Sequence, residues 1–333
     1  TLDMIAVAAP NGSHTVRVVS EGYSAAVVEL DDLAPRIREK GMPSALIRGT
    51  AAGLTRAGFS PAGFDAYVSS HLPSGAGLSS SASFECLIGA IFNVFFCGGK
   101  ASAVQIAQAG RFAESEYFGK PCGLMDQLAC ATGGFAAMDF AEPAAPQVRR
   151  QTFSPRQHGL CLFSVHTGGS HADLTGQYAA IPAEMKKVAA LFNEPYLRRV
   201  RPEEFYQALP TLRGKVSDRA LLRAMHFFEE DERVVRQVAA LDRNDLFAFL
   251  WEIICSGRSS YMYLQNVYAN PKDQSLSLAL AMAEHMMLDK DGAWRVHGGG
   301  FAGTTLNFVP DKLLNQFIET MEGTFGEHCC NVL

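Results

Sequence analysis

Hydrophobic and polar positions alternate along much of the first 70 residues, as they do in strands with one buried face. This alternation predicts four strands, at Leu2–Ala9, Val16–Ser20, Ala25–Leu30 and Phe64–Ser69. The turn-forming residues Pro10–Ser13 predict that the first two strands form a β-hairpin. Between the third and fourth strands, helical spacing of apolar residues predicts a helix over Ser44–Ala57 that ends at Gly58.

The next 85 residues begin with a loop rich in glycine and serine. Helical patterns then follow at Ala82–Phe96, from Ser102 to Phe118 and briefly after Pro121, and strand patterns follow at Gly134–Phe140 and Val148–Phe153. The composition of Ala141–Pro146 is typical of a linker.

The remaining chain is mostly helical between two strand regions. We predict a strand at Leu160–His166 and helices from Ile181 to Lys290, with Pro182, Pro202 and Pro271 at helix starts or in loops. A strand, a turn of three glycines, a strand at Thr304–Val309 and a helix from Pro310 complete the pattern. Because strands and helices are mixed without a regular parallel alternation, the fold class is predicted to be α+β.

Composition and charge exclude several classes of protein. The 333 residues are 48% hydrophobic, enough for one or two domains, and a net charge of −5 without a basic stripe speaks against nucleic-acid binding. The apolar stretch Cys86–Cys97 is too short to cross a bilayer, so we expect no membrane partner. The eight cysteines form no C-x-x-C pair and there is no signal peptide pattern, which together favour a cytoplasmic protein.

The segment Pro73–Ser83, with the sequence PSGAGLSSSAS, carries the strongest candidate chemistry. It lies between a predicted strand and a predicted helix. Its glycines permit close approach of backbone to a ligand, and free amides at a helix start favour a phosphate. The alternative is an ordinary serine-capped helix after a flexible turn. The P-loop is excluded because no lysine follows the glycines, and the dinucleotide motif because Ser80 replaces its third glycine.

Three segments together resemble the GHMP kinases, and specifically their galactokinase branch. They are Pro73–Ala82 with the following Ser83-Phe84-Glu85, Pro121–Gln127 (PCGLMDQ), and Arg295–Gly303 (RVHGGGFAG). Ala302 stands where the family usually has glycine. The resemblance implies a two-lobed GHMP kinase fold with ATP between the lobes. The first lobe, residues 1–155, would be ribosomal S5 domain 2-like, and the second, 156–333, ferredoxin-like.

The resemblance also implies roles for individual residues. ATP would be bound by Pro73, Gly75, Gly77, Leu78, Ser79, Ser80, Ser81, Gly298, Gly299 and Gly300. Asp126 would be the catalytic residue, either as a base or by orienting the attacking sugar hydroxyl; its alternative is a helix cap. Ser81 and Glu114 would bind Mg²⁺, with the neighbouring Glu116 as the competing carboxylate.

Tyr178 and Gly299, together with Asp126, would bind the sugar. For Tyr178 the alternative is a half-buried residue at a helix start. Two stretches depart from the galactokinase pattern: Ala179–Pro182 replaces an arginine-rich run, and Tyr268–Pro271 replaces a Cys-x-Glu-Leu-Asp-like run.

The implied reaction is phosphorylation of the anomeric hydroxyl of galactose by ATP, giving galactose 1-phosphate, in a protein expected to be a monomer. The alternatives are a catalytically silent sensor of sugar and ATP, and a GHMP kinase for another sugar or alcohol. Galactokinases carry an N-terminal Glu-His-x-Asp signature with a catalytic arginine, and the chain, which begins at Thr1, contains no such segment. We therefore expect residues to be missing at the front, and the chain as written to be inactive or badly impaired.

Overall fold

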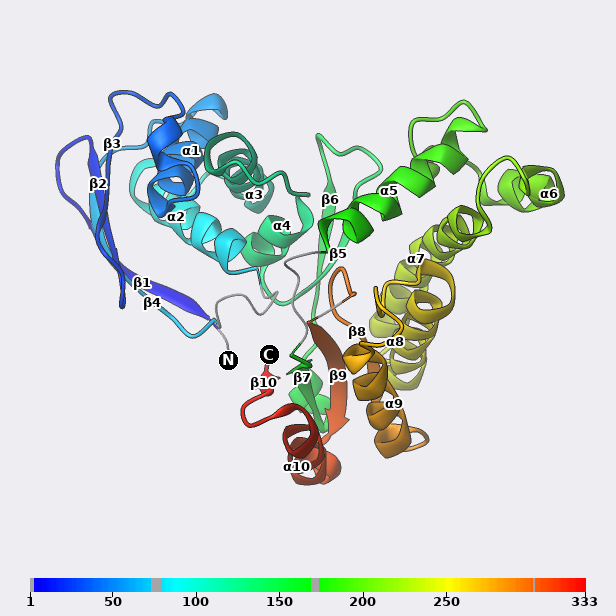
Figure 1. Cartoon of the computed structure of the whole chain (residues 1–333). Coiled ribbons are helices and arrows are strands. Elements are labelled where there is room, and N and C mark those ends of the chain that lie inside the picture. Colours follow the sequence, from blue (N-terminus) through cyan, green and yellow to red (C-terminus); the bar gives the residue numbers. More distant parts are fainter. Residues whose placement is uncertain (1–2, 73–78, 169–173, 302) are drawn as a thin grey trace. The chain divides into compact units, whose positions relative to one another are not determined.

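The computed structural model describes residues 3–72, 79–168, 174–301 and 303–333. The chain divides into two compact units, Thr1–Gln151 and Thr152–Leu333 (Figure 1). Both units combine helices with a mainly antiparallel sheet, in agreement with the α+β prediction.

The sheet of the first unit has four strands in the order β1 (Met4–Pro10), β4 (Phe64–Ser70), β2 (Thr15–Ser20) and β3 (Ala26–Glu29). One face of it is buried against α1 (Pro43–Arg56) and α2 (Ser80–Phe96), and this packing forms the core of the unit. The opposite face leaves Val7 and Tyr67, which are direct cross-strand partners, exposed to solvent. A short 3₁₀ turn, η1 (Ile37–Glu39), precedes α1.

The predicted hairpin of the first two strands is wrong, although both strands exist. Strand β4 lies between them, antiparallel to β1 and parallel to β2. Gly63 lies between the two sides of the turn. Its amide donates to the carbonyl of Ser13, and its carbonyl accepts from the amide of Asn11. The turn residues Asn11-Gly12 carry no information about β4, which lies about 50 residues further along the chain. The pairing of β1 and β2 with this strand determines the topology of the sheet.

Replacing Gly63 by alanine is expected to destabilise the first unit by about 1–3 kcal/mol, because backbone atoms surround the site. A Cβ there would lie 2.5 Å from the carbonyl oxygens of Ser13 and Thr15. The free energy of unfolding can be measured by chemical denaturation. Gly123→Ala is the matched control, since a Cβ at Gly123 meets nothing within 4 Å. Equal stability of the two variants would contradict this account of the open turn.

The helices of the first unit pack through small residues. A Cβ at Gly53 would lie 2.6 Å from Cα of Ala109 in α3 (Ala103–Phe112), and one at Gly49 would lie 2.5 Å from Cα of Ala113. Ala113 begins η2 (Ala113–Phe118), a π-helical turn that continues α3 to the end predicted for this helix. The close approach of α1 therefore fixes the position of the π-helical turn. A further helix, α4 (Met125–Thr132), packs on α2 and α3.

The segment predicted as a linker, Ala141–Pro146, is instead the turn of a hairpin. It connects β5 (Phe135–Asp139) with β6 (Gln147–Gln151), which pair in antiparallel fashion within the first unit. The amide of Ala145 donates to the carbonyl of Glu142 within this turn. Alanine and proline between two strands are thus compatible with a tight connection as well as with a linker.

The second unit contains a four-stranded antiparallel sheet in the order β10 (Cys330–Val332), β7 (Leu160–His166), β9 (Thr304–Pro310) and β8 (Ala293–Val296). The strands at Leu160 and Thr304 confirm the sequence prediction, whereas the short edge strand β10 was not predicted. The helices that accompany the sheet are α5 (Thr175–Ala190), α6 (Pro202–Leu212), α7 (Asp218–Asp242), α8 (Leu246–Ser259), α9 (Ser275–Met287) and α10 (Leu314–Phe325). Short turns lie at η3 (Pro155–His158), η4 (Leu197–Arg199), η5 (Ser260–Leu264) and η6 (Asp311–Leu313).

Pro182 lies inside a helix, which corrects its predicted place at a helix start or in a loop. The helix α5 begins at Thr175, seven residues earlier, so Pro182 falls in its second turn. A proline there leaves the carbonyl four residues before it without its helical donor. Pro202, by contrast, begins α6 and Pro271 lies in a turn, as predicted.

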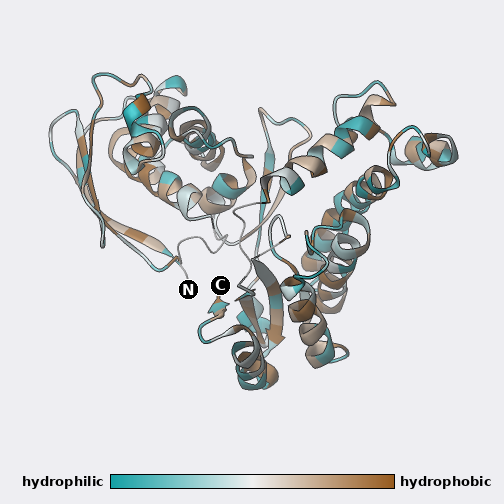
Figure 2. Ribbon diagram, viewed as in Figure 1, coloured by the Kyte–Doolittle hydropathy of each residue, from teal (hydrophilic) through white to brown (hydrophobic). Residues whose placement is uncertain are grey.

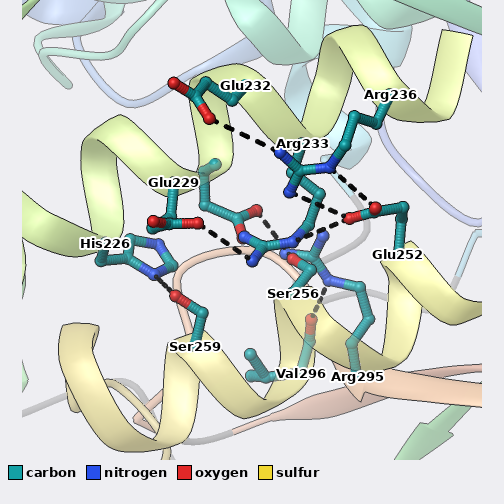
Figure 3. Close-up of polar contacts among 11 residues, drawn as sticks. His226, Glu229, Glu232, Arg233, Arg236, Glu252, Ser256, Ser259, Arg295 and Val296 are labelled. Atoms are coloured by element: carbon teal, nitrogen blue, oxygen red, sulfur yellow. Dashed lines mark hydrogen bonds and ion pairs between the residues drawn. The ribbon is translucent and has the colours of Figure 1, made fainter. Parts of the chain in front are cut away.

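A polar network fastens α7 to α8 beside β8 (Figure 3). Arg233 of α7 pairs with Glu230 and with Glu252 of α8, and Ser256 of α8 donates to Glu230 at 2.7 Å. Burial lowers the pKa of the nearby His226 to about 4, so this ring remains neutral beside the hydroxyl of Ser259. These charges are largely buried and mutually paired, and their contacts join α7 to α8.

Hydrophobic residues are interspersed with hydrophilic ones along the helices of both units (Figure 2). Within the described ranges, no helix is both long and apolar enough to span a membrane. The apolar stretch Cys86–Cys97 lies in α2 and its C-cap, where a helix over Ala82–Phe96 was predicted.

Candidate functional site

Ser79, in the predicted phosphate loop and at the start of α2, contacts Asp126. Pro73, Gly75, Gly77 and Leu78 lie outside the described residues. Ser79 has a left-handed backbone, with φ of 52°, and its side chain makes no capping hydrogen bond to α2. Its hydroxyl donates instead to Oδ2 of Asp126 at 2.7 Å. The serine expected as a cap therefore joins the end of the loop to the predicted catalytic carboxylate.

Asp126 is the second residue of α4, and Leu124 holds the N-cap position of that helix. The capping alternative for Asp126 is therefore wrong. The side chain is exposed, so its carboxylate is accessible from solvent. Asp126 lies in the first turn of α4.

Glu114 lies on the π-helical turn η2 and is only 2% exposed. Its Oε1 accepts hydrogen bonds from Oγ of Ser81 at 2.7 Å and from Nζ of Lys120 at 2.9 Å. Glu116, the competing carboxylate, is exposed to solvent. The fold thus brings together the hydroxyl and the carboxylate that the sequence predicted as a pair, and it turns Glu116 away from the buried position.

The electrostatics of Glu114 suit a cation. Burial raises the pKa of this carboxyl, but the hydrogen bonds from Ser81 and Lys120 outweigh burial and leave the pKa below its usual value. An ionised carboxylate oxygen beside a hydroxyl oxygen is a donor set that Mg²⁺ accepts while retaining several waters. Among the described residues no cluster of three or more His, Cys, Asp or Glu side chains offers a different metal site.

Gln127 connects Glu114 to a second buried carboxyl, Glu85 of α2. Its amide Nε2 donates to Oε2 of Glu114 at 2.8 Å and to Oε2 of Glu85 at 3.1 Å. Burial, aided by the negative charge of Glu114, raises the pKa of Glu85 to about 8. Gln127 and Glu85 both belong to segments quoted in the sequence analysis, but no role was predicted for them. Lys120 carried no sequence signal.

The second unit brings together the other group of predicted residues. In the turn after β8, Gly298 and Gly300 have φ of +63° and +75°, and a Cβ at Gly300 would lie 2.0 Å from the carbonyl oxygen of Asn266. The side-chain amide of Asn266 donates to the carbonyl of Gly299 at 3.1 Å. Only glycine satisfies such a close approach combined with a left-handed backbone.

Tyr178 lies in the first turn of α5 and covers the same glycine turn. Its hydroxyl donates to the carbonyl of Gly300 at 2.7 Å, and its ring meets that of Phe301 edge-on at 5.4 Å. A Cβ at Gly299 would lie 2.7 Å from Cε1 of Tyr178. The structure therefore places Tyr178 and Gly299, both predicted to bind the sugar, in direct contact with each other.

Comparison with known proteins identifies relatives of this chain. The sequence pattern described as "GHMP kinases N terminal domain" matches residues 45–134. The galactokinase of Streptomyces coelicolor is 31% identical over 315 residues, covering 93% of this chain and 78% of the relative. The galactokinase of Actinobacillus pleuropneumoniae serotype 5b is 30% identical over 250 residues, which cover 75% of this chain but only 62% of the relative.

Solved structures agree on the fold. The galactokinase of Lactococcus lactis in complex with galactose superposes with a TM-score of 0.80 at 20% identity, over 100% of this chain and 85% of that protein. The phosphomevalonate kinase of Streptococcus pneumoniae, in complex with phosphomevalonate and AMPPNP, gives a TM-score of 0.57 at 14% identity, over 99% of this chain and 88% of that one. The α+β GHMP kinase fold predicted from the sequence is thereby confirmed, and the chain belongs to the GHMP kinase family, in which it is similar to galactokinases.

Proposed function

We propose that the protein transfers the γ-phosphoryl group of ATP to the anomeric hydroxyl of galactose, giving galactose 1-phosphate and ADP. The observation that carries this proposal is the convergence of two hydroxyl–carboxylate pairs at the start of α2. Ser79 donates to Asp126 and, two residues later, Ser81 donates to Glu114, each at 2.7 Å. In a phosphoryl transfer, one carboxylate can accept the proton of the attacking hydroxyl while another holds a metal ion against the phosphates.

Asp126 is the residue that handles the sugar hydroxyl in this proposal. The sugar oxygen attacks phosphorus, the bond from phosphorus to the leaving ADP oxygen breaks, and the hydroxyl proton passes to the carboxylate of Asp126. The donation from Ser79 orients this carboxylate through Oδ2, and Oδ1 has no hydrogen-bond partner among the described residues. The exposure of the side chain supports the role because a substrate must reach it.

Ser81 and Glu114 are the residues that would bind Mg²⁺. When bound, the cation would neutralise negative charge on the phosphates of ATP. The ionised state of Glu114 supports this assignment, and Gln127 prevents rotation of the carboxylate by holding its second oxygen. In the second unit, the glycine turn and Tyr178 are proposed to serve ATP and sugar binding, as the resemblance implies.

Sugar-dependent release of ADP in the intact protein tests the function. We expect galactose to support phosphorylation better than glucose, mannose and N-acetylgalactosamine, with phosphate attached at the anomeric position as judged by ³¹P NMR. Faster turnover of another sugar would show that galactose is the wrong substrate, while the proposal that the protein is a sugar kinase would stand. Binding of sugar and ATP without ADP release would contradict the catalytic proposal and favour a sensor.

A further inference from the structure

The carboxylate of Glu114 has two oxygens with different surroundings. Oε2 accepts from the amide of Gln127, which is 1% exposed and forms part of the core beneath the site. Oε1 accepts from Ser81 and from Lys120, whose side chain is 64% exposed. One oxygen is therefore fixed by a buried donor, and the other by a donor that extends from solvent.

Lys120 donates hydrogen bonds to Glu114 through both its backbone amide and its side-chain ammonium. The amides of Gly119 and Lys120 both donate to the backbone carbonyl of Glu114 at 3.0 Å, where the π-helical turn ends. Gly119 has a left-handed backbone, with φ of +88°, which folds the chain back in this way. The Lys120 ammonium then reaches Oε1 of the same residue. The main chain can retain this conformation when the side chain leaves, because the backbone bonds do not involve Nζ.

We infer that Lys120 is a displaceable counter-ion of the metal site, whose ammonium neutralises Glu114 until a divalent cation takes Oε1. The inference rests on the proposed function in one respect, namely that Ser81 and Glu114 bind Mg²⁺. An ammonium and a divalent cation cannot both occupy the same side of one carboxylate oxygen without repulsion between their charges. The exposed lysine leaves into water at little cost, since it is already mostly solvated.

A Mn²⁺ titration tests the inference without measuring catalysis. Free Mn²⁺ is followed by electron paramagnetic resonance in the presence of ADP, for the intact protein and its variants. Removing the competing charge with Lys120→Met should lower the half-saturating Mn²⁺ concentration by roughly two- to fivefold, the effect of one partly exposed ion pair. Lys100→Met, at an exposed lysine in the turn after α2, is the matched control and should leave the concentration unchanged.

Thermal unfolding gives a second measurement. Without divalent cation, Lys120→Met should lower the melting temperature, because Glu114 remains buried and loses its counter-ion. Added Mn²⁺ and ADP should raise the melting temperature of this variant by more than that of the parent protein. A smaller rise, or a higher half-saturating concentration in Lys120→Met, would overturn the inference and indicate that the lysine supports binding.

Glu114→Gln distinguishes failure of the proposed metal site from failure of the role inferred for Lys120. If the parent binds Mn²⁺ and Glu114→Gln does not, the metal site stands, and an unchanged affinity in Lys120→Met then overturns only the role of the lysine. If the parent itself binds no Mn²⁺ with ADP, or Glu114→Gln binds it as the parent does, both the proposed metal site and the inference drawn from it are wrong.

Discussion

Asp126→Asn is expected to slow sugar-dependent ADP release in the intact protein by roughly 10²–10⁴-fold, the usual contribution of a positioned general base. Asparagine retains the shape of the side chain and can still accept the hydrogen bond from Ser79, so the loop and α4 should keep their positions. It cannot take up the proton of the sugar hydroxyl. The loss should appear in kcat, with the KM for ATP changed little.

The matched control for this variant is Glu116→Gln. It also replaces an exposed carboxylate by its amide in the first unit, but the hydroxyls of Ser79 and Ser81 donate to Asp126 and Glu114 instead. We expect its turnover to differ from that of the parent by less than about twofold, as is usual for surface changes. If Asp126→Asn turned over galactose as fast as Glu116→Gln, the proposed mechanism would be wrong even if the protein were a kinase.

Local patterns in the sequence were sufficient to predict most of the helices and strands. Alternation marked β1 to β4 because one face of this sheet is buried against α1 and α2 while the other faces solvent. The alternation of hydrophobic and polar residues does not predict the order of the strands in the sheet, because this order depends on contacts between distant segments. The insertion of β4 between β1 and β2 is such a contact, and the signal for it was the single glycine at position 63, whose close environment is visible only in three dimensions.

The candidate site was predictable as far as its residues stand in contiguous motifs. Asp126 and Gln127 lie within the segment Pro121–Gln127, and Ser79 and Ser81 within the segment Pro73–Ser83. Glu114 was preferred to Glu116 through resemblance. In the structure Glu114, on the π-helical turn η2, continues the buried face of α3 four residues after Gly110 and accepts the hydrogen bond of Ser81, whereas Glu116 is exposed. Lys120 follows the turn, so its approach to Glu114 depends on this same local geometry.

Glu85 makes the stability of the first unit depend on pH. Its pKa is about 8 in the folded protein, raised first by burial and also by the charges of Glu114 and Asp126, against an ordinary value of 4.5 in the unfolded chain. The hydrogen bond from Gln127 and the charge of Lys120 oppose this rise without cancelling it. The folded state therefore holds a proton that the unfolded state releases above pH 4.5, and the stabilisation is lost as the pH rises through 8.

We expect the free energy of unfolding to fall by roughly 3 kcal/mol between about pH 5.5 and about pH 8.5 through this group. Glu85→Gln should remove that decline, because an amide of the same shape has no proton to lose and can still accept from Gln127 through its Oε1. Chemical denaturation at the two pH values, with Glu116→Gln as the control, measures the difference. A decline of the same size in Glu85→Gln would mean that another group carries the pH dependence. Loss of the decline would identify Glu85 as a neutral, protonated member of the core that supports Gln127 and, through it, the carboxylate of Glu114.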